Sequence, residues 1–247
     1  MKVLGGEKAE CLGRAIVTAL LLREEATVIA AVRDPDHETA KSLQGLPKRQ
    51  TAHLIVVKID AASHTDHASA VKQLQDQCGI KSIDVVIANA GIIKTTPLVR
   101  ESTIEGLLEH YHVNAISTVM LYQATRPLLL EAHNPRFIVT SGSGGSIAQQ
   151  DKIQFPLAEY GPSRAAVNWL FRKVHFEEER IAAVLVDPGL IDTETGGSAV
   201  TQFGMHRSNL QSVEQSAENY LKVVDSASKE NTSGKFISAQ SQTELEW

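Results

Sequence analysis

The stretch that decides the fold begins Phe137-Ile138-Val139-Thr140-Ser141-Gly142-Ser143-Gly144-Gly145 and ends Tyr160-Gly161-Pro162-Ser163-Arg164. Its apolar start predicts a buried strand that runs out into a serine- and glycine-rich loop. Pro162 fits a helix only in the first turn, so Tyr160 is expected at the mouth of the next helix. Tyr160 and Arg164 then lie on one helix face, one turn apart. A strand-end hydroxyl and this tyrosine can meet over one substrate oxygen, although a serine-rich loop beside a half-buried tyrosine explains these residues equally well when taken alone.

The composition bounds the class of protein. The chain has 247 residues, 43% of them hydrophobic, and a formal net charge of −5. One α/β domain of this length is ordinary, and the charge gives no reason to expect nucleic acid or an acidic membrane as a partner. Cys11 and Cys78 make no disulfide framework, which favours a reducing compartment. Because no apolar run approaches about 18 residues and a strand-like segment opens the chain, we expect a cytoplasmic protein without a membrane span or signal peptide.

Short apolar runs alternate with longer amphipathic segments along the whole chain. Strands are expected at Lys2–Leu4, Thr27–Val32, His53–Ile59, Ile83–Ala88, Phe137–Thr140, Ile181–Val186 and Lys235–Ser238. Helices are expected around Leu12–Arg23, Thr65–Gln77, Ser102–Glu131, Ala158–Glu179 and Ser212–Ala227. This alternation indicates a parallel sheet buried on both faces.

We therefore expect a single α/β domain over residues 1–247, a Rossmann-type doubly wound parallel sheet of about seven strands with helices on both faces. Residues 1–133 are expected to form mainly the dinucleotide-binding half, and residues 134–247 the catalytic and substrate-binding half. The segment Asp192–Asn209, rich in Gly, Ser and Thr, is a candidate lid.

The turn after the first expected strand carries Gly6 and Gly13. In a doubly wound fold this turn holds a pyrophosphate against a helix N-terminus. Gly6, Cys11, Leu12 and Gly13 are therefore candidate cofactor-binding residues, although glycines near a strand end are common and the signal is weak alone.

Other candidates stand where later strands end. Arg33 follows the second strand, where a cation can pair with a ribose 2′-phosphate; a solvated arginine is an equal alternative. Asp60 closes the third strand and either touches an adenine or caps the next turn. Asn89-Ala90-Gly91 ends the fourth strand and lets the backbone pass close to a ligand. Asp187-Pro188-Gly189-Leu190-Ile191-Asp192-Thr193 forms another tight turn at the same edge of the sheet.

Asn114 lies within a predicted helix. A buried asparagine must find hydrogen-bond partners, so it is either a polar group between packed helices or part of a proton or water network. No metal site is expected, because His64 and His67 stand at a helix start without a second cluster of ligands.

Taken together, these motifs resemble the short-chain dehydrogenase/reductase family over essentially the whole chain. The matching pieces are the glycine-bearing first turn, Asn89-Ala90-Gly91, Asn114, the Ser141 loop, Tyr160, and Pro188-Gly189 with Ile191 and Thr193. The segments Ala30–Pro35 and Thr232–Ile237, with the terminal Trp247, resemble fungal ketoreductases of the norsolorinic-acid-reductase type.

The resemblance implies hydride transfer between NADP(H) and a carbonyl or alcohol. It implies that Tyr160 is the general acid, which gives its proton to the substrate oxygen as hydride arrives at carbon. Ser141 would orient that oxygen, with Ser143 as a close competitor, because the separation of 19 positions from Ser141 to Tyr160 exceeds the family's usual spacing. Asn114 would hold a water in a proton relay, and Arg33 would favour NADP(H) over NAD(H).

The candidate catalytic residues are thus Asn114, Ser141, Tyr160 and Arg164. The candidate cofactor-binding residues are Gly6, Cys11, Leu12, Gly13, Arg33, Asp60, Asn89, Ala90, Gly91, Pro188, Gly189, Ile191 and Thr193.

The chain departs from the family pattern at two places. Arg164 stands where the family has a lysine that binds the nicotinamide ribose, lowers the pKa of the tyrosine and passes protons. Arginine keeps the charge and can bind hydroxyls, but it does not release a proton at usable pH. In the first turn the loop is one residue longer, about Cys11 takes the place of the middle glycine, and Glu7 and Glu10 add negative charge. We expect cofactor binding to be weakened or rearranged.

The leading hypothesis is an NADP(H)-dependent ketoreductase that acts on a bulky, apolar carbonyl of the kind found in fungal secondary metabolism. The alternatives are a relative that catalyses an isomerisation or cyclisation with Tyr160 and Arg164, and a catalytically silent binding protein on the same fold. A homodimer or homotetramer, paired through the helices that carry Asn114 and Tyr160, is the expected assembly.

Overall fold

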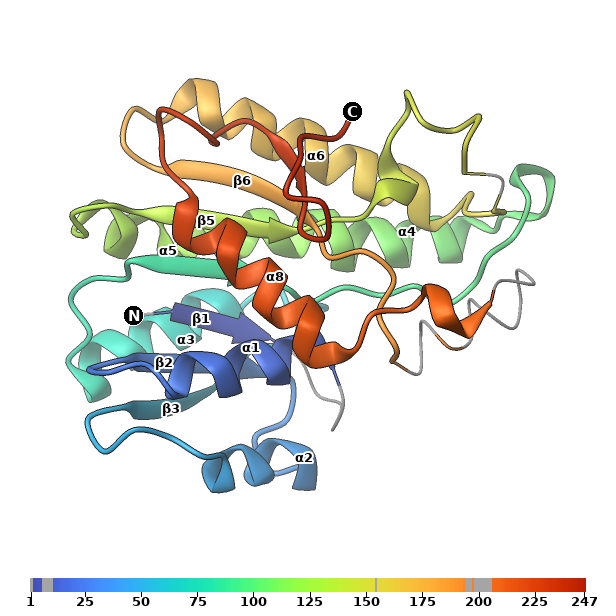
Figure 1. Ribbon diagram of the computed structural model, residues 1–247. Helices are drawn as coiled ribbons and strands as arrows, with labels where there is room; N and C mark the ends of the chain where they lie inside the picture. Colours follow the sequence, from blue (N-terminus) through green and yellow to red (C-terminus); the bar gives the residue numbers. More distant parts are fainter. Residues whose placement is uncertain (1, 6–10, 154, 194–196, 198–205) are drawn as a thin grey trace.

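The structure is a computed structural model, and it describes residues 2–5, 11–153, 155–193, 197 and 206–247. Within these residues one seven-stranded parallel sheet has the order β3-β2-β1-β4-β5-β6-β7 (Figure 1). The strands are β1 Lys2–Gly5, β2 Thr27–Val32, β3 His53–Lys58, β4 Val85–Ala88, β5 Arg136–Thr140, β6 Ala182–Asp187 and β7 Phe236–Ser238.

The helices are α1 Leu12–Leu21, α2 Glu38–Lys41, α3 Asp66–Cys78, α4 Ile104–Tyr111, α5 Ser117–Leu130, α6 Tyr160–Glu177 and α8 Val213–Ser226. A π-helical turn, η3 His112–Ile116, joins α4 to α5. The 3-10 turns are η1 Ser42–Gly45, η2 Val99–Glu101, η4 Ser143–Gly145 and η5 Arg207–Asn209. Among the described residues no helix is both long and apolar enough to cross a bilayer.

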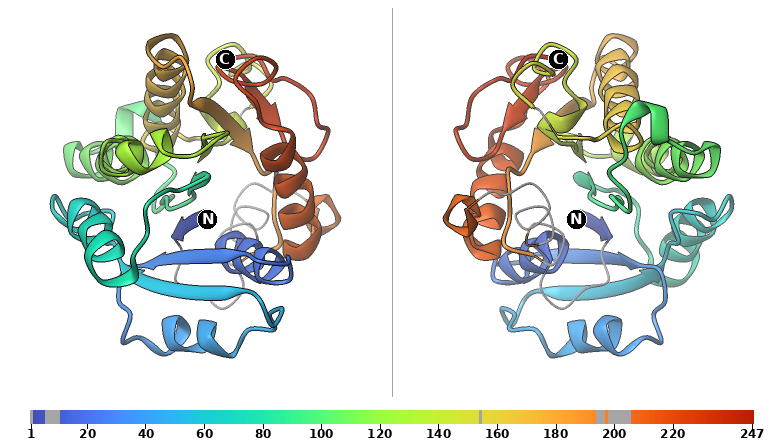
Figure 2. Two further views of the ribbon diagram at one scale, coloured as in Figure 1. Left: turned by 90° about the vertical axis from the view of Figure 1, so that its left-hand side faces the viewer. Right: turned by 90° about the vertical axis from the view of Figure 1, so that its right-hand side faces the viewer.

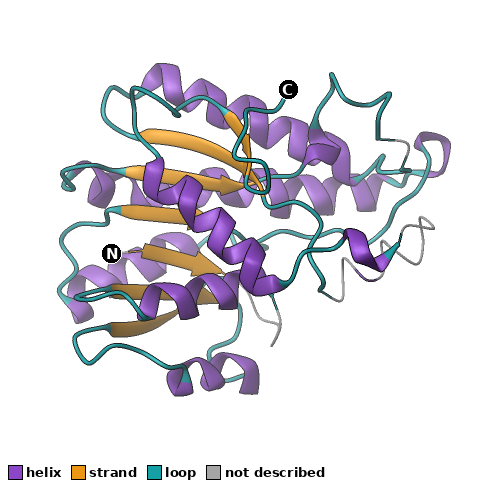
Figure 3. Ribbon diagram, viewed as in Figure 1, coloured by secondary structure: helices purple, strands orange, loops and turns teal. Residues whose placement is uncertain are grey.

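Helices cover both faces of the sheet (Figures 2 and 3). Alternate residues of each strand point to opposite faces, so each strand feeds two cores. Along β2, Val28 and Ala30 join the core under α1 and α8, whereas Ile29 joins the core under α3, α5 and α6. Because both faces are buried, the strands read as continuous apolar runs.

The predicted fold class is confirmed, and each strand begins and ends within two residues of its expected bounds. The helix predicted around Ser102–Glu131 is confirmed as an unbroken helical run through α4, the π-helical turn His112–Ile116 and α5, and within this run only the π-helical turn was not predicted. Helix α2 was not predicted, since four residues carry too little periodicity to signal a helix.

The site lies where the strand order reverses. β1 pairs with β2 on one side and with β4 on the other. In doubly wound sheets this reversal opens a crevice at the carboxyl ends of the strands, and the turns after β2, β4, β5 and β6 all reach that edge.

The last residues of the chain fix the loop that follows β5. Trp247 accepts a backbone hydrogen bond from Ala148 N at 2.8 Å, and the hydroxyl of Ser146 donates to Glu246 O at 2.8 Å. The indole of Trp247 lies 5.8 Å from the ring of Phe236 in β7 and carries the guanidinium of Arg172 4.8 Å above it. The loop after β5 is therefore tied to both β7 and α6.

Candidate active site

Tyr160 is the first residue of α6, which places Pro162 in the first turn as predicted. The phenol ring rests on the loop after β5. A side chain at residue 142 would bring its Cβ within 2.7 Å of Tyr160 Oη, and one at residue 144 would come within 3.4 Å of ring atom Cε1. Glycine at residue 142 therefore leaves the phenolic oxygen its space.

Arg164 lies one turn further along α6 and is only 6% exposed. Its guanidinium carbon is 5.2 Å from the centre of the Tyr160 ring, and Nη1 donates to Thr140 O at 3.0 Å. Any side chain at Gly91 would collide with Nη2. The glycine that was expected to let backbone approach a ligand thus makes room for this guanidinium.

The two candidate serines point to different partners. The hydroxyl of Ser141 is buried and donates to Asn168 Oδ1 at 2.6 Å. Ser143 is partly exposed, and both its backbone N–H and its side chain bond to the carboxyl group of Asp187. Both serines line the cavity that Tyr160 faces, and Ser143 is the more open of the two.

Asn114 is fully buried in the π-helical turn. Its Oδ1 accepts from Ile92 N at 2.8 Å, and its Nδ2 donates to Ile92 O at 3.0 Å and to Ser163 Oγ at 2.9 Å. In this structure Asn114 joins the segment after β4 to α6, so it acts as a polar group between packed elements. Its participation in a proton relay stays a prediction.

Asp187, at the end of β6, is a site residue that the sequence reading missed. It lines the Tyr160 cavity, and its Oδ1 accepts from Gly189 N at 3.0 Å. Burial raises the pKa of this carboxyl group, against hydrogen bonds from Gly189 and Ser143 and the charge of Arg164, which lower it. The sequence could have indicated Asp187 by its position directly before Pro188-Gly189, at the sheet edge that carries the other candidate residues.

Glu159, directly before Tyr160, was missed as well. Its buried carboxylate accepts hydrogen bonds from the Thr95 hydroxyl, from Thr103 N at 2.9 Å and from the Thr103 hydroxyl at 3.2 Å. The Thr95 hydroxyl, followed by the Thr103 N–H, holds the pKa of Glu159 below its usual range. The carboxylate therefore joins the start of α4 to the start of α6, one residue from the phenol.

The phosphate turn is described from Cys11 onward, so Gly6, Glu7 and Glu10 lie outside the described residues. Cys11 stands at the N-cap of α1 without a side-chain cap, and the first turn contains no acidic residue. Leu12 and Gly13 are buried in that turn. A helix start whose N-cap residue makes no side-chain hydrogen bond among the described residues fits an anionic group.

The remaining cofactor candidates lie along the same sheet edge. Asp60 Oδ1 accepts from Ala62 N at 2.9 Å, so in this structure it caps the next turn. Asn89 Oδ1 accepts from the Thr140 hydroxyl at 3.2 Å, which joins β4 to β5. Arg33 directly follows β2 and is exposed, and Ala90 directly follows Asn89.

The turn after β6 is held to α8 and to its own backbone. Pro188 O accepts from the Ser216 hydroxyl at 3.2 Å, and Thr193 N donates to Ile191 O at 2.8 Å. Gly189 has φ +77°, which favours glycine. Most of the candidate lid lies outside the described residues, but its ends meet, since Asp192 Oδ1 pairs with Arg207 Nη2 at 2.9 Å.

A cavity of about 430 Å³ opens in front of Tyr160. Ile93, Phe155, Leu157, Leu190 and Ile191 give it apolar walls, and Tyr160, Ser143 and Asp187 stand along its polar side. A pocket with apolar walls and a few convergent polar groups is the usual form of a small-molecule site.

A family model described as short chain dehydrogenase matches residues 3–202. The chain belongs to the short-chain dehydrogenase family. Among its curated relatives, norsolorinic acid ketoreductase nor1 of Dothistroma septosporum is 35% identical over 96% of this chain and 88% of its own length. Norsolorinic acid ketoreductase stcE of Emericella nidulans is 36% identical over 96% of this chain and 89% of its own.

A solved short-chain dehydrogenase has the same overall fold. The NADPH-bound carbonyl reductase from chicken fatty liver superposes with a TM-score of 0.86 at 25% identity, covering 100% of this chain and 98% of that one. These comparisons confirm the predicted family, the fold and the enzyme class, and NADPH, the predicted cofactor, is what that reductase carries. The individual roles assigned to the site residues stay predictions.

The carboxylate that anchors the start of α6 makes stability depend on pH. The lowered pKa of Glu159 means that its stabilising effect is present above the pKa of an unfolded glutamate, about 4.3, and is lost as pH falls through the lowered value. We expect Glu159→Gln to lower the melting temperature at pH 7 and the difference from wild type to shrink as pH falls below about 4.

Differential scanning fluorimetry across this pH range measures the effect. Glu131→Gln, at an exposed glutamate that follows α5, is the control and should leave the melting temperature unchanged across this pH range. A gap between Glu159→Gln and wild type that stayed constant down to pH 3 would contradict the assigned role of the carboxylate.

Proposed function

We propose that this protein is an NADP(H)-dependent ketoreductase that reduces the carbonyl group of a bulky, apolar substrate of the secondary-metabolite kind. The observation that carries the proposal is the phenol of Tyr160 on the wall of a largely apolar cavity, with the Arg164 guanidinium 5.2 Å from its ring. The names of the fungal relatives, both norsolorinic acid ketoreductases, support a large aromatic ketone as the substrate class.

Three features fit a nicotinamide dinucleotide phosphate. The start of α1 is uncapped and has no acidic residue in its first turn, so the N–H groups near Leu12 and Gly13 suit the pyrophosphate. Arg33 follows β2, where it suits a ribose 2′-phosphate. Arg164 Nε is buried without a hydrogen-bond partner among the described residues, which leaves a donor for a ribose hydroxyl. When bound, the cofactor supplies the hydride.

The residues of the chain handle the proton. Tyr160 donates its phenolic proton to the carbonyl oxygen of the substrate, and the fixed charge of Arg164 beside the ring stabilises the phenolate that remains. Ser143, which is more open to the cavity than Ser141, would turn its hydroxyl from Asp187 and donate a hydrogen bond to the same oxygen. Since arginine keeps its proton, the phenolate regains its own from water that reaches the cavity.

Nucleotide binding tests the cofactor part of the proposal. We expect purified protein to bind NADPH more tightly than NADH, and Arg33→Ala to weaken NADPH binding by about tenfold or more, because a charge-assisted hydrogen bond to the 2′-phosphate is lost. Isothermal titration calorimetry gives the two dissociation constants. Arg100→Ala, at an exposed arginine in the turn before α4, should change neither. Absence of binding to both nucleotides would reject the reductase.

Substitution of the phenol tests the chemistry. We expect Tyr160→Phe to lower kcat for ketone reduction by about 10²–10⁴-fold, the usual contribution of a general acid, with the dissociation constant of NADPH unchanged. Tyr111→Phe, at an exposed tyrosine on α4, should keep full activity. Ser143→Ala should lower kcat more than Ser141→Ala. Full activity in Tyr160→Phe would remove the tyrosine from the mechanism.

The apolar face of α4 and α6 supports pairing with a second copy of the chain. Ile104 and Leu108 on α4, and Trp169 and Phe176 on α6, are each more than 60% exposed, and the two helices pack against each other. We expect the protein to sediment as a dimer or tetramer and Trp169→Asp to shift it toward the monomer, whereas Leu22→Asp, at another exposed apolar position, should not. A monomeric wild type would reject this assembly.

A further inference from the structure

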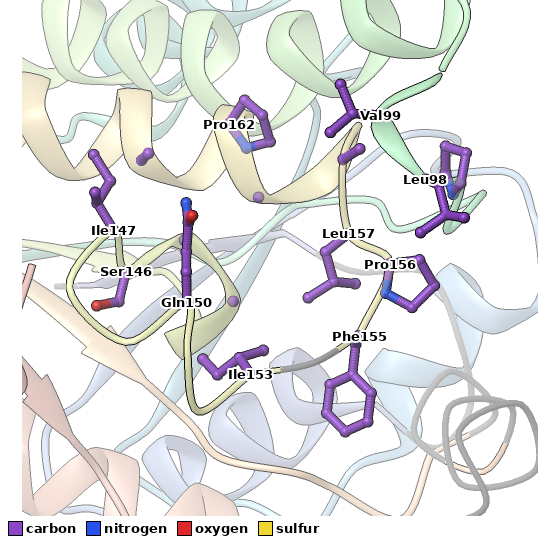
Figure 4. A pocket seen from close by; sticks show the side chains of 16 residues that line it. Leu98, Val99, Ser146, Ile147, Gln150, Ile153, Phe155, Pro156, Leu157 and Pro162 are labelled. Carbon is purple, nitrogen blue, oxygen red and sulfur yellow. The ribbon is translucent and has the colours of Figure 1, made fainter. Parts of the chain in front are cut away.

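A second apolar cavity lies beside the one that Tyr160 faces. Its volume is about 540 Å³, which is in the range that holds a drug-sized ligand. In Figure 4, Leu98 and Val99 stand on one side of it and Ile147 and Gln150 on the other, with Pro162 of α6 between them. We refer to it as the side cavity.

The lining of the side cavity selects an apolar occupant. Of the described residues that line it, only Ser146 and Gln150 have polar side chains, and none is charged. The Ser146 hydroxyl is already bonded, since it donates to Glu246 O at 2.8 Å and accepts from Gln149 N at 3.2 Å. A phosphate or carboxylate would find no charged partner among these lining residues, whereas a ring of carbon atoms would gain by leaving water.

The side cavity and the Tyr160 cavity share one wall. Gly144, Ile153, Phe155 and Leu157 line both. Leu157 rests on two glycines at this boundary: a Cβ at residue 144 would lie 2.8 Å from Leu157 Cδ1, and one at residue 161 would lie 3.9 Å from Leu157 Cβ. The absence of a side chain at Gly144 therefore leaves room for Leu157 at the boundary between the two spaces.

The far wall of the side cavity is held in place without a ligand. Ala148 N donates to Trp247 O at 2.8 Å, and Lys152 N and Ile153 N both donate to Gln149 O, at 3.0 and 3.1 Å. These bonds anchor the loop to the last residues of the chain and close it upon itself. A wall that is fixed beforehand costs little ordering when a ligand binds.

We infer that the side cavity is a second subsite of the substrate, which holds a flat, apolar ring system attached to the carbonyl group beside Tyr160, and that Leu157 determines how far this ring system can extend. The inference rests on the proposed ketoreductase function and adds to it the shape of the substrate: a compact ketone occupies the Tyr160 cavity alone, and a fused-ring aryl ketone uses both.

The test places a larger side chain in the side cavity and leaves the Tyr160 cavity unchanged. Ala165 of α6 lines the side cavity and does not line the Tyr160 cavity, so Ala165→Leu shortens only the second subsite. The probes are 2-acetylnaphthalene, a fused-ring ketone, and cyclohexanone, a compact one. We expect Ala165→Leu to lower the ratio of the two kcat/KM values by about tenfold, the scale on which a pocket senses a few methylene groups.

Two further variants complete the set. Leu157→Ala removes the division and should raise the same ratio, because the fused rings can then cross the boundary freely. Ala68→Leu makes the same change on the exposed face of α3, outside both cavities, and should leave the ratio as in wild type. An unchanged ratio in Ala165→Leu, with normal melting temperature, would overturn the inference.

Binding separates this inference from the proposed function. Calorimetric titration with 2-acetylnaphthalene in the absence of nucleotide should give a dissociation constant that Ala165→Leu raises by about tenfold. Binding that responds to Ala165→Leu in a protein that reduces neither ketone would support the subsite and reject the ketoreductase. Reduction of both ketones with no response to Ala165→Leu, or no binding of 2-acetylnaphthalene to wild type, would reject the subsite.

Discussion

The close packing of the start of α6 on the loop Gly142–Gly145 is the contact on which the whole site depends. A Cβ at Gly161 would lie 2.9 Å from Gly144 O, and one at Gly145 would collide with Arg164 Cβ and lie 2.9 Å from the backbone carbon of Arg164. The helix can approach this closely only because both surfaces lack side chains. The approach puts the phenol of Tyr160 against the end of β5, where substrate and cofactor meet in folds of this type.

Arg164 gains a structural role from the same approach. Through Nη1 it binds Thr140 O at the end of β5, its Nη2 occupies the space above Gly91 after β4, and its carbon stem packs on Gly145. A lysine is a point charge on a flexible stem and could hold one of these contacts at a time, whereas the planar guanidinium holds two backbone segments together. Compared with the family's lysine, Arg164 therefore loses the ability to pass protons but holds the two backbone segments rigidly. The positive charge beside Tyr160 is kept.

Two carboxyl groups near the site, those of Asp187 and Glu159, have pKa values that are shifted in opposite directions. The charge of Arg164 opposes the effect of burial on the pKa of the Asp187 carboxyl group. Glu159, on the outer side of the helix start, is instead stabilised by hydroxyl and N–H donors and stays ionised. The pKa values of two carboxyl groups near one phenol thus shift in opposite directions, because hydrogen-bond donors dominate at Glu159 and burial dominates at Asp187.

Most of the fold could be predicted from the sequence, because strands buried on both faces leave unbroken apolar runs and the helices between them keep a helical period. The position of Tyr160 followed from Pro162, which can occupy only a first turn. Asp187 and Glu159 could not be found this way, since their importance comes from partners more than 40 residues away along the chain, Ser143 for one and Thr103 for the other. The sequence could not decide between Ser141 and Ser143 for the same reason. The order of residues within one loop does not reveal that the Ser141 hydroxyl donates to Asn168, which lies in a later helix.

Glu246 and Trp247 anchor the first part of the loop after β5. The loop leaves β5 through the glycines and serines of Ser141–Ser146, and such a segment loses much conformational freedom on folding. Backbone bonds from Ala148 to Trp247 and from the Ser146 hydroxyl to Glu246 supply the compensating contacts, and the indole is itself held between Phe236 and Arg172. Hydrogen bonds to Glu246 and Trp247 thus hold the part of the loop that forms the far wall of the side cavity, although neither residue lines the cavity that Tyr160 faces.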